Sequence, residues 1–319
     1  MNDQNKTYTL EYLAILANVN HSLRWVDFGD GYRVETINRD NLINLLAELY
    51  DLPKHEIEHK IEVHAGYESS KKTIYILRKS FDKPALLYES KKGHNWVDDW
   101  SEVHLLISVF QPHVFEIIQL LRLYRPGDLY LYNSIFFTYE EQCGEIRPTL
   151  FSSIEDEKSR AGTTFNIPRN LRHSINEFVE HNPIGTLHPN VRLALQSYDL
   201  SFEVSNNNLA FLTLMTAQEA LLNESHQELK FRVCRATAVL LGTSTQKSRR
   251  ILSDMKKLYD KRSLLVHTGI CKKFSEDDVN LLKEYVRQSI VRVIQLSIPK
   301  DKLTVRLSEL GFDQGTRLK

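Results

Sequence analysis

An arginine and a histidine five residues apart, Arg262 and His267, are the side chains of this sequence best suited to acid–base chemistry. A histidine exchanges a proton near neutral pH, so it can serve as a general base or a general acid. The arginine guanidinium stays charged and offers a planar fork of donors that fits phosphate oxygens. Ser263, directly after the arginine, can bond the same phosphate or orient the histidine. The three residues together indicate chemistry at a phosphate group.

Arg262 belongs to the apolar stripe of the segment that carries it. Residues at i, i+4, i+7, i+11 and i+15 of this segment fall on one helical face, and they are Ile251, Met255, Leu258, Arg262 and Val266. An isolated buried charge is very costly, so the arginine must be paired or must face a wet cleft or an interface. The stripe therefore predicts a partner or a ligand for Arg262.

Glu219 occupies a similar position in an earlier helical segment, in phase with Leu212, Met215 and Leu222. The simplest structural arrangement is an ion pair of Glu219 with Arg262 or with Arg235. Both partners are open at this point, and such a pair alone would account for the buried phase of the charges.

The spacing of the arginine and the histidine limits their geometry. Five helical residues correspond to about 140° of rotation, so the two side chains would not lie side by side on one straight helix. Either the helix ends near Val266, which Thr268-Gly269 would permit, or the two residues act on a ligand in a broad cleft. A cleft shared by two subunits would serve.

The segment before the pair is strongly basic, although the whole chain has 41 basic and 41 acidic residues. Residues 229–262 contain ten Lys and Arg against two acidic residues, a local net charge of +8. Such a segment can attract a polyanion, or it can be a solvated helix face balanced by acids elsewhere. The candidates for RNA contact are Lys247, Arg249, Arg250, Lys256, Lys257 and Lys261.

Composition places the chain among globular proteins. Its 319 residues are enough for two domains, with 42% hydrophobic and 26% charged residues. No apolar run reaches the roughly 18–20 residues of a membrane span, and the N-terminus lacks an apolar signal core. The cysteines form no CxxC pair, which fits a reducing compartment. We therefore expect a cytoplasmic protein that does not bind a membrane.

The order of elements predicts an α+β N-terminal region followed by an all-α bundle. We expect an α+β domain over 1–150, a linker or loop over 151–167, a helical domain over 168–300 and a C-terminal tail over 301–319. In the first domain, residues 24–28 and 32–37 flank a Gly-Asp-Gly turn and predict a hairpin. Helices are expected over 168–181, 188–198, 206–223, 228–242, 245–266 and 275–297.

A second cluster in the first domain contains possible metal ligands. His94, Asp98 and Glu102 would share a helical face, with Asp99 and His104 nearby. No HExxH or comparable signature accompanies them. A metal hydrolase is therefore a third hypothesis, and a solvated acidic loop explains the cluster as well.

The Arg-x4-His spacing is expected about once by chance in a chain of this composition, so its context matters. In that context, residues 262–267 (Arg-Ser-Leu-Leu-Val-His) resemble the ribonuclease motif of HEPN domains, specifically the ApeA-like group. Residues 258–260, Gly269 and the earlier segment 211–222 also resemble that group, as do 235–241 and 285–287. The resemblance covers roughly residues 205–297. A HEPN subgroup paired with a nucleotidyltransferase has a tyrosine where this chain has Gly269, so that mode of regulation is not expected.

The resemblance implies a HEPN-like bundle and a metal-independent endoribonuclease without a cofactor. His267 and Arg262 would be catalytic, assisted by Ser263 and supported by Glu219 and Arg235. Cleavage through the RNA 2′-OH would leave a 2′,3′-cyclic phosphate and a 5′-OH. The resemblance further implies a homodimer and a role in anti-phage defence, abortive infection or toxicity. The N-terminal region would then sense a phage or nucleotide trigger.

A different class of function fits the same residues. A non-catalytic HEPN-like module that dimerises or binds nucleic acid would use Arg262 and Glu219 as a structural ion pair. In that case His267 would have no role in RNA cleavage.

Overall fold

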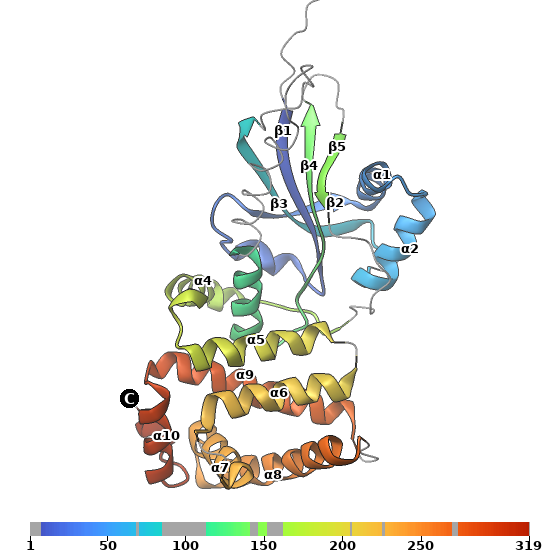
Figure 1. Ribbon diagram of the computed structural model, residues 1–319. Coiled ribbons are helices and arrows are strands. Elements are labelled where there is room, and N and C mark those ends of the chain that lie inside the picture. The colour runs from blue at the N-terminus through green and yellow to red at the C-terminus, as the bar shows by residue number, and fades with distance from the viewer. Residues whose placement is uncertain are drawn as a thin grey trace, which may run out of the picture. The chain divides into compact units, whose positions relative to one another are not determined.

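The computed structural model of the chain divides into two compact units, Met1–Val179 and Glu180–Lys319. The first combines a β-sheet with helices, and the described part of the second is helical, which confirms the predicted fold class (Figure 1). The described residues are 8–67, 70–84, 113–140, 146–151, 162–204, 206–224, 227–269 and 274–318.

Within the described residues, the sheet of the first unit has five antiparallel strands in the order β2-β3-β1-β4-β5. The strands are β1 (Tyr8–Ala17), β2 (Arg33–Asn38), β3 (Thr73–Pro84), β4 (Tyr130–Glu140) and β5 (Ile146–Phe151). The central strand, β1, pairs with β3 on one side and β4 on the other. Its residues 10–17 are buried without interruption. Apart from Glu11, which pairs with Arg78 of β3, this run is apolar, as is typical of a strand covered on both faces.

Alternate residues of β1 enter two different cores, because successive strand side chains point to opposite faces. Tyr12 and Ala14 pack with the helix over residues 113–124. Leu13 and Ile15 pack with helices α1 (Arg39–Tyr50) and α2 (Lys54–Ala65). The sheet is therefore the middle layer of this unit, with helices on each face (Figure 1).

The hairpin expected from residues 24–28 and 32–37 is wrong. Residues 29–31 do turn, and all three have positive φ. Before the turn, however, the chain forms the 3-10 helix η1 (His21–Trp25), which the Asn20 side chain caps. After the turn, β2 pairs with β3. The local alternation predicted a strand partner nearby, but packing on the sheet supplied a partner much later in the chain.

The helical unit continues from α4, which spans the division between the units. From residue 169 onward the described helical elements, in chain order, are η2 (Arg169–Leu171), α4 (Arg172–His181), η3 (Ile184–Thr186), α5 (Pro189–Glu203), α6 (Asn207–Leu222), α7 (Leu229–Leu241), α8 (Thr245–Thr268), α9 (Glu276–Leu296), α10 (Lys300–Glu309) and η4 (Gly315–Arg317).

Helix α6 is the centre of this unit and contacts α5, α7, α8, α9 and α10. Its Gln218 is fully buried and donates to the hydroxyls of Thr237 on α7 (2.7 Å) and Ser289 on α9 (3.0 Å). Because a buried amide is costly without partners, these bonds favour one rotation of α6. That rotation directs the next residue, Glu219, to the helix that carries the Arg-x4-His pair.

The C-terminal segment is packed onto the same unit. Helix α10 contacts α6 and α7 and buries Leu303 and Leu307, and Leu318 is also buried. The predicted boundaries at 150, 168 and 300 stay predictions. The division of the chain into its two compact units falls between Val179 and Glu180.

Candidate functional site

Helix α8 positions the candidate catalytic residues. It begins after Ser244, whose side chain accepts a hydrogen bond from the Lys247 amide at 3.2 Å. It continues through the whole motif to Thr268 and is capped by Gly269 in the left-handed conformation. The motif is therefore helical throughout, and the helix does not end before His267.

Arg262 lies beside Glu219, which is one of the two pairings that the sequence left open. Its Nε is 3.7 Å from Glu219 Oε1, and Tyr259 Oη donates to the same oxygen at 2.6 Å. The guanidinium also lies 5.8 Å from the Tyr259 ring centre, within the range of a cation–π contact. An ion pair of 3.7 Å is too long for a hydrogen bond. The charge of Glu219 and the face of the Tyr259 ring therefore hold the guanidinium, and 29% of the Arg262 side chain stays exposed.

Tyr259 is a member of this cluster that the sequence pattern did not single out. It lies three residues before Arg262, on the same side of the helix, and that spacing is the signal that was available. Burial, together with the Glu219 carboxylate that accepts its hydrogen bond, raises the pKa of the Tyr259 hydroxyl above its usual range. Tyr259 is therefore a neutral donor to Glu219 at physiological pH.

His267 faces a different direction from Arg262. It is exposed in the last turn of α8, and within the described part of the chain it has no hydrogen-bond or ion-pair partner. Because α8 is continuous, the two residues are about 140° apart around its axis. Ser263 is one turn before His267 on the neighbouring surface. A single chain therefore places Ser263 near His267 but does not bring His267 to Arg262.

Arg235 has a different partner from the one considered in the sequence. Its Nη1 donates to the Leu307 carbonyl at 2.5 Å and its Nη2 to the Leu310 carbonyl at 2.7 Å. These carbonyls belong to the C-terminal end of α10, where positive charge is favourable. Arg235 thus anchors α10, and it is Arg262 that pairs with Glu219.

Five of the six candidate RNA-contacting residues are exposed on α8, namely Lys247, Arg249, Arg250, Lys256 and Lys257. The Arg250 Nε lies 3.8 Å from Asp254 of the same helix. The sixth residue, Lys261, is used within the fold, since its Nζ donates to both oxygens of Asp278 at 2.6 Å.

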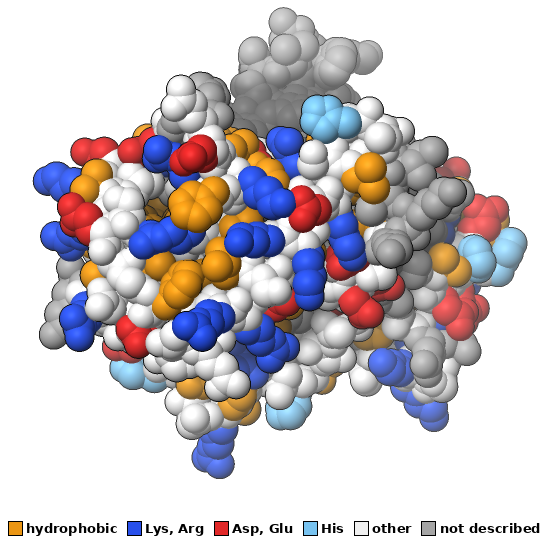
Figure 2. Space-filling view, turned by 90° about the horizontal axis from the view of Figure 1, so that it is seen from below, with side chains coloured by type: hydrophobic (Ala, Val, Ile, Leu, Met, Phe, Trp, Pro, Cys, Tyr) orange, Lys and Arg blue, Asp and Glu red, His pale blue; other side chains and the backbone are white. Residues whose placement is uncertain are grey.

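Arg249, Lys256 and His267 lie on one stripe of α8. Their spacings of seven and eleven residues are close to whole numbers of helical turns. Asp260 lies within the same stripe, and its carboxylate is paired with Lys230 of α7. Figure 2 shows the helical unit from below, where Lys and Arg side chains gather with Asp and Glu side chains between them. The exposed cations Arg249 and Lys256 therefore lie on the same side of α8 as the exposed His267.

Replacing Lys261 with glutamine is expected to lower the free energy of unfolding by about 1 kcal/mol at pH 7. Burial alone would raise the pKa of Asp278, but hydrogen bonds from Lys261 and Ser275 lower it below its ordinary value. The carboxylate therefore stabilises the fold above the ordinary carboxylate pKa of about 4 and loses that effect as the pH falls through its lowered folded value. Urea unfolding at several pH values measures the difference, which should shrink in acid.

Lys256→Gln is the matched control for this experiment, because Lys256 is an exposed lysine of the same helix. It should change the free energy of unfolding by less than about 0.5 kcal/mol. A Lys261→Gln effect that is the same at pH 7 and below pH 4 would contradict the ion-pair explanation.

Within the described residues, no group of three or more His, Cys, Asp or Glu side chains is arranged to hold a metal ion. The possible ligands between His94 and His104 lie outside the described residues. No described helix is both long enough and apolar enough to cross a membrane.

Comparisons of the chain with protein-family models, with curated proteins and with solved structures found no match.

Proposed function

We propose that this protein is a metal-independent endoribonuclease of the HEPN type, with Arg262 and His267 as its catalytic pair. The observation that carries the proposal is the contrast between these two side chains on α8. Arg262 is held by Glu219 and Tyr259 with part of its guanidinium side chain open. His267 is exposed at the end of the same helix and has no described partner. A positioned cation and an unengaged imidazole are what cleavage at a phosphate needs.

The charges on α8 support an RNA substrate. Arg249 and Lys256 lie on the His267 stripe, and each is exposed. Cations in such a row can neutralise successive phosphates of a strand and guide it to the histidine. The whole chain carries no net charge, so the attraction is local to this helix.

The reaction uses the nucleophile that RNA itself carries. A neutral His267 takes the proton of the 2′-OH, and the 2′-oxygen then forms a bond to the adjacent phosphorus. The bond from phosphorus to the 5′-oxygen breaks, and a protonated His267 gives its proton to that oxygen. Arg262 stabilises the negative charge that grows on the phosphate oxygens. The products are a 2′,3′-cyclic phosphate and a 5′-OH.

The proposed active form is a homodimer. Arg262 and His267 are about 140° apart on one helix, so a second copy is needed to bring an arginine opposite a histidine. A twofold arrangement brings two Arg262/His267 pairs together, each with its arginine from one chain and its histidine from the other. Leu264 and Val266, beside His267, are apolar side chains that are 45% and 51% exposed. An interface at this end of α8 would cover them.

The first unit is proposed to act as the sensor of the enzyme. It has its own sheet and its own apolar cores, so it can bind a ligand as a separate folded body. A phage component or a nucleotide would be its trigger, and the cleavage of RNA in the cytoplasm would limit infection or growth. Expression of the intact chain in cells is expected to arrest growth in a way that depends on His267.

A second candidate function is favoured by a specific observation. The Arg262 charge is already compensated by Glu219, and Tyr259 completes the cluster. A satisfied ion pair between α6 and α8 suits a non-catalytic module that dimerises or binds nucleic acid. In this alternative the fold depends on Arg262, while RNA integrity and cell growth do not depend on His267.

Incubation of the purified full chain with single-stranded RNA in EDTA tests the proposal. We expect cleavage in EDTA, with products whose 3′ ends carry a cyclic phosphate and resist ligation until that phosphate is removed. The double variant Arg262→Ala/His267→Ala should leave the RNA intact. Cleavage by the double variant at the wild-type rate would sink the assignment of the site. Intact RNA with the wild-type chain, in the test tube and in expressing cells, would favour the non-catalytic module.

A further inference from the structure

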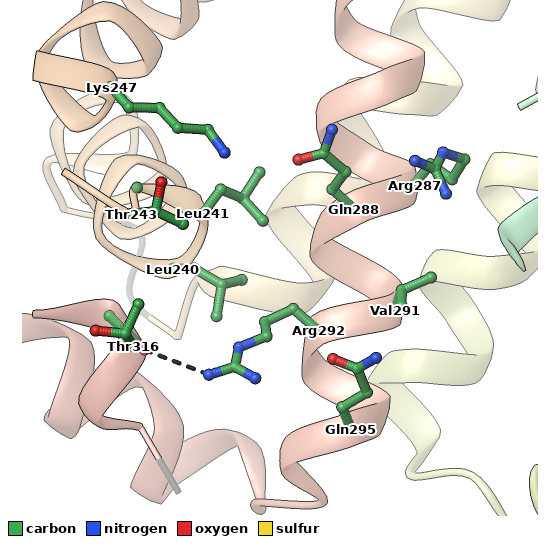
Figure 3. A pocket seen from close by; sticks show the side chains of 12 residues that line it. Leu240, Leu241, Thr243, Lys247, Arg287, Gln288, Val291, Arg292, Gln295 and Thr316 are labelled. Atoms are coloured by element: carbon green, nitrogen blue, oxygen red, sulfur yellow. Dashed lines mark hydrogen bonds between the residues drawn. The ribbon is translucent and has the colours of Figure 1, made fainter. Parts of the chain in front are cut away.

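An open hollow of about 520 Å³ lies in the helical unit, away from Arg262 and His267. It is bounded by the end of α7, the start of α8, one face of α9 and the 3-10 helix η4 (Figure 3). Hollows of about 300–1,000 Å³ are the usual size for small-molecule sites. The volume is therefore sufficient for a ligand of nucleotide size.

The lining of this hollow is cationic. The twelve described residues that line it include Lys247, Arg287 and Arg292 and no aspartate or glutamate. The Arg287 guanidinium is bonded to Glu284, at 2.8 and 2.6 Å, so its charge is compensated. Lys247 is exposed, and within the described residues its ammonium has no carboxylate partner. Lys247 and Arg292 thus remain to attract an anion.

The two cations extend into the hollow from different helices. Figure 3 shows Lys247 of α8 pointing towards Gln288 of α9, and Arg292 of α9 reaching across towards Thr316. Arg292 Nη2 donates to the carbonyls of Leu318 and Gly315, at 3.2 and 3.5 Å. One guanidinium nitrogen is therefore held by the backbone, and the others remain as donors for a ligand.

The wall behind these residues is tightly packed. A Cβ atom added to Gly315 would lie 1.9 Å from the Val239 carbonyl oxygen of α7. Only glycine permits this close approach of η4 to α7. The carbonyls that hold Arg292 are therefore built into the fold, and the hollow is preformed.

We propose that this hollow binds a small phosphorylated ligand of the nucleoside phosphate class. Lys247 and Arg292 hold its phosphate. The amides of Gln288 and Gln295 and the hydroxyls of Thr243 and Thr316 offer donors and acceptors to its sugar or base. Leu240, Leu241 and Val291 provide an apolar surface. Among the described lining residues there is no aromatic side chain on which successive bases of a strand would stack, which favours a single nucleotide over an RNA chain. This proposal does not rest on the proposed RNA cleavage, although Lys247 is also a candidate for RNA contact.

Calorimetric titration of the full chain with AMP, ADP and inorganic phosphate tests the proposal. We expect AMP or ADP to bind with a Kd of about 1 mM or tighter, and at least about tenfold more tightly than inorganic phosphate. Lys247→Gln should weaken nucleotide binding about tenfold, because it removes one charge-assisted contact. Lys302→Gln, an exposed lysine of α10 outside the hollow, should change the Kd less than twofold.

Arg292→Lys provides a second variant, which keeps the charge but loses the fork that bonds both the backbone and a phosphate. It should also weaken nucleotide binding about tenfold, and its thermal unfolding should be followed to confirm that it folds. The proposal is overturned if no nucleotide binds in this range or if both variants bind like the wild type. It is also overturned if inorganic phosphate binds as tightly as AMP, or if an RNA oligonucleotide binds Lys247 and Arg292 while nucleotides do not.

Discussion

His267→Ala is expected to reduce RNA cleavage by about 100- to 10,000-fold, the range over which a positioned acid or base contributes. The melting temperature should change by less than about 2 °C. The side chain is exposed and has no described partner, so its removal leaves no polar group unpaired. Cleavage rates and thermal unfolding of the same preparations measure the two effects.

His188→Ala is the matched control, because His188 is an exposed histidine of the same unit that lies outside the Arg-x4-His motif. It should cleave RNA at the wild-type rate. A His267→Ala protein that cleaves RNA as fast as this control would contradict a catalytic role for the histidine. An equal loss of activity in both variants would point to a general effect on the fold.

Arg262→Ala is expected to reduce cleavage by about 100- to 1,000-fold, which is the effect of removing a group that stabilises transition-state charge. It should also lower the free energy of unfolding by about 1 kcal/mol, because Glu219 loses its cation but keeps the Tyr259 hydroxyl. Arg262→Lys retains the positive charge but lacks the planar fork. It should therefore recover most of the stability and less than about a tenth of the activity.

A variant Arg262→Lys that matches the wild type in both assays would show that the residue contributes its positive charge and not its planar fork of donors. Mixing the inactive Arg262→Ala and His267→Ala chains then tests whether the site is shared. If each site takes its arginine from one chain and its histidine from the other, random pairing should restore about a quarter of the wild-type activity. No recovery after exchange of subunits would contradict a shared site.

Local sequence determined the main helices of the second unit. The ranges 206–223, 228–242, 245–266 and 275–297 lie within two residues of α6, α7, α8 and α9. Apolar residues at helical spacing define their buried faces, and polar caps define their starts. Asn206 accepts from the Asn208 amide, and Ser275 forms a capping box with Asp278. These signals act over a few residues, so they can be read without a tertiary structure.

The sequence also placed Arg262 in the buried stripe of its helix, and the structure confirms that this side chain is mostly covered. It left open which residue would compensate the charge. Packing decided that Glu219 pairs with Arg262, while Arg235 bonds to carbonyls at the end of α10. In the first unit, packing likewise paired β2 with β3 and removed the expected hairpin.

Helix phase by itself determines which side of a helix a residue occupies. The residue that it meets depends on how neighbouring helices are rotated and aligned, and the buried bonds of Gln218 to α7 and α9 help to set this here. Only the tertiary structure therefore showed that Tyr259 and Glu219 hold Arg262, and that α8 continues through His267 with the histidine on its exposed side.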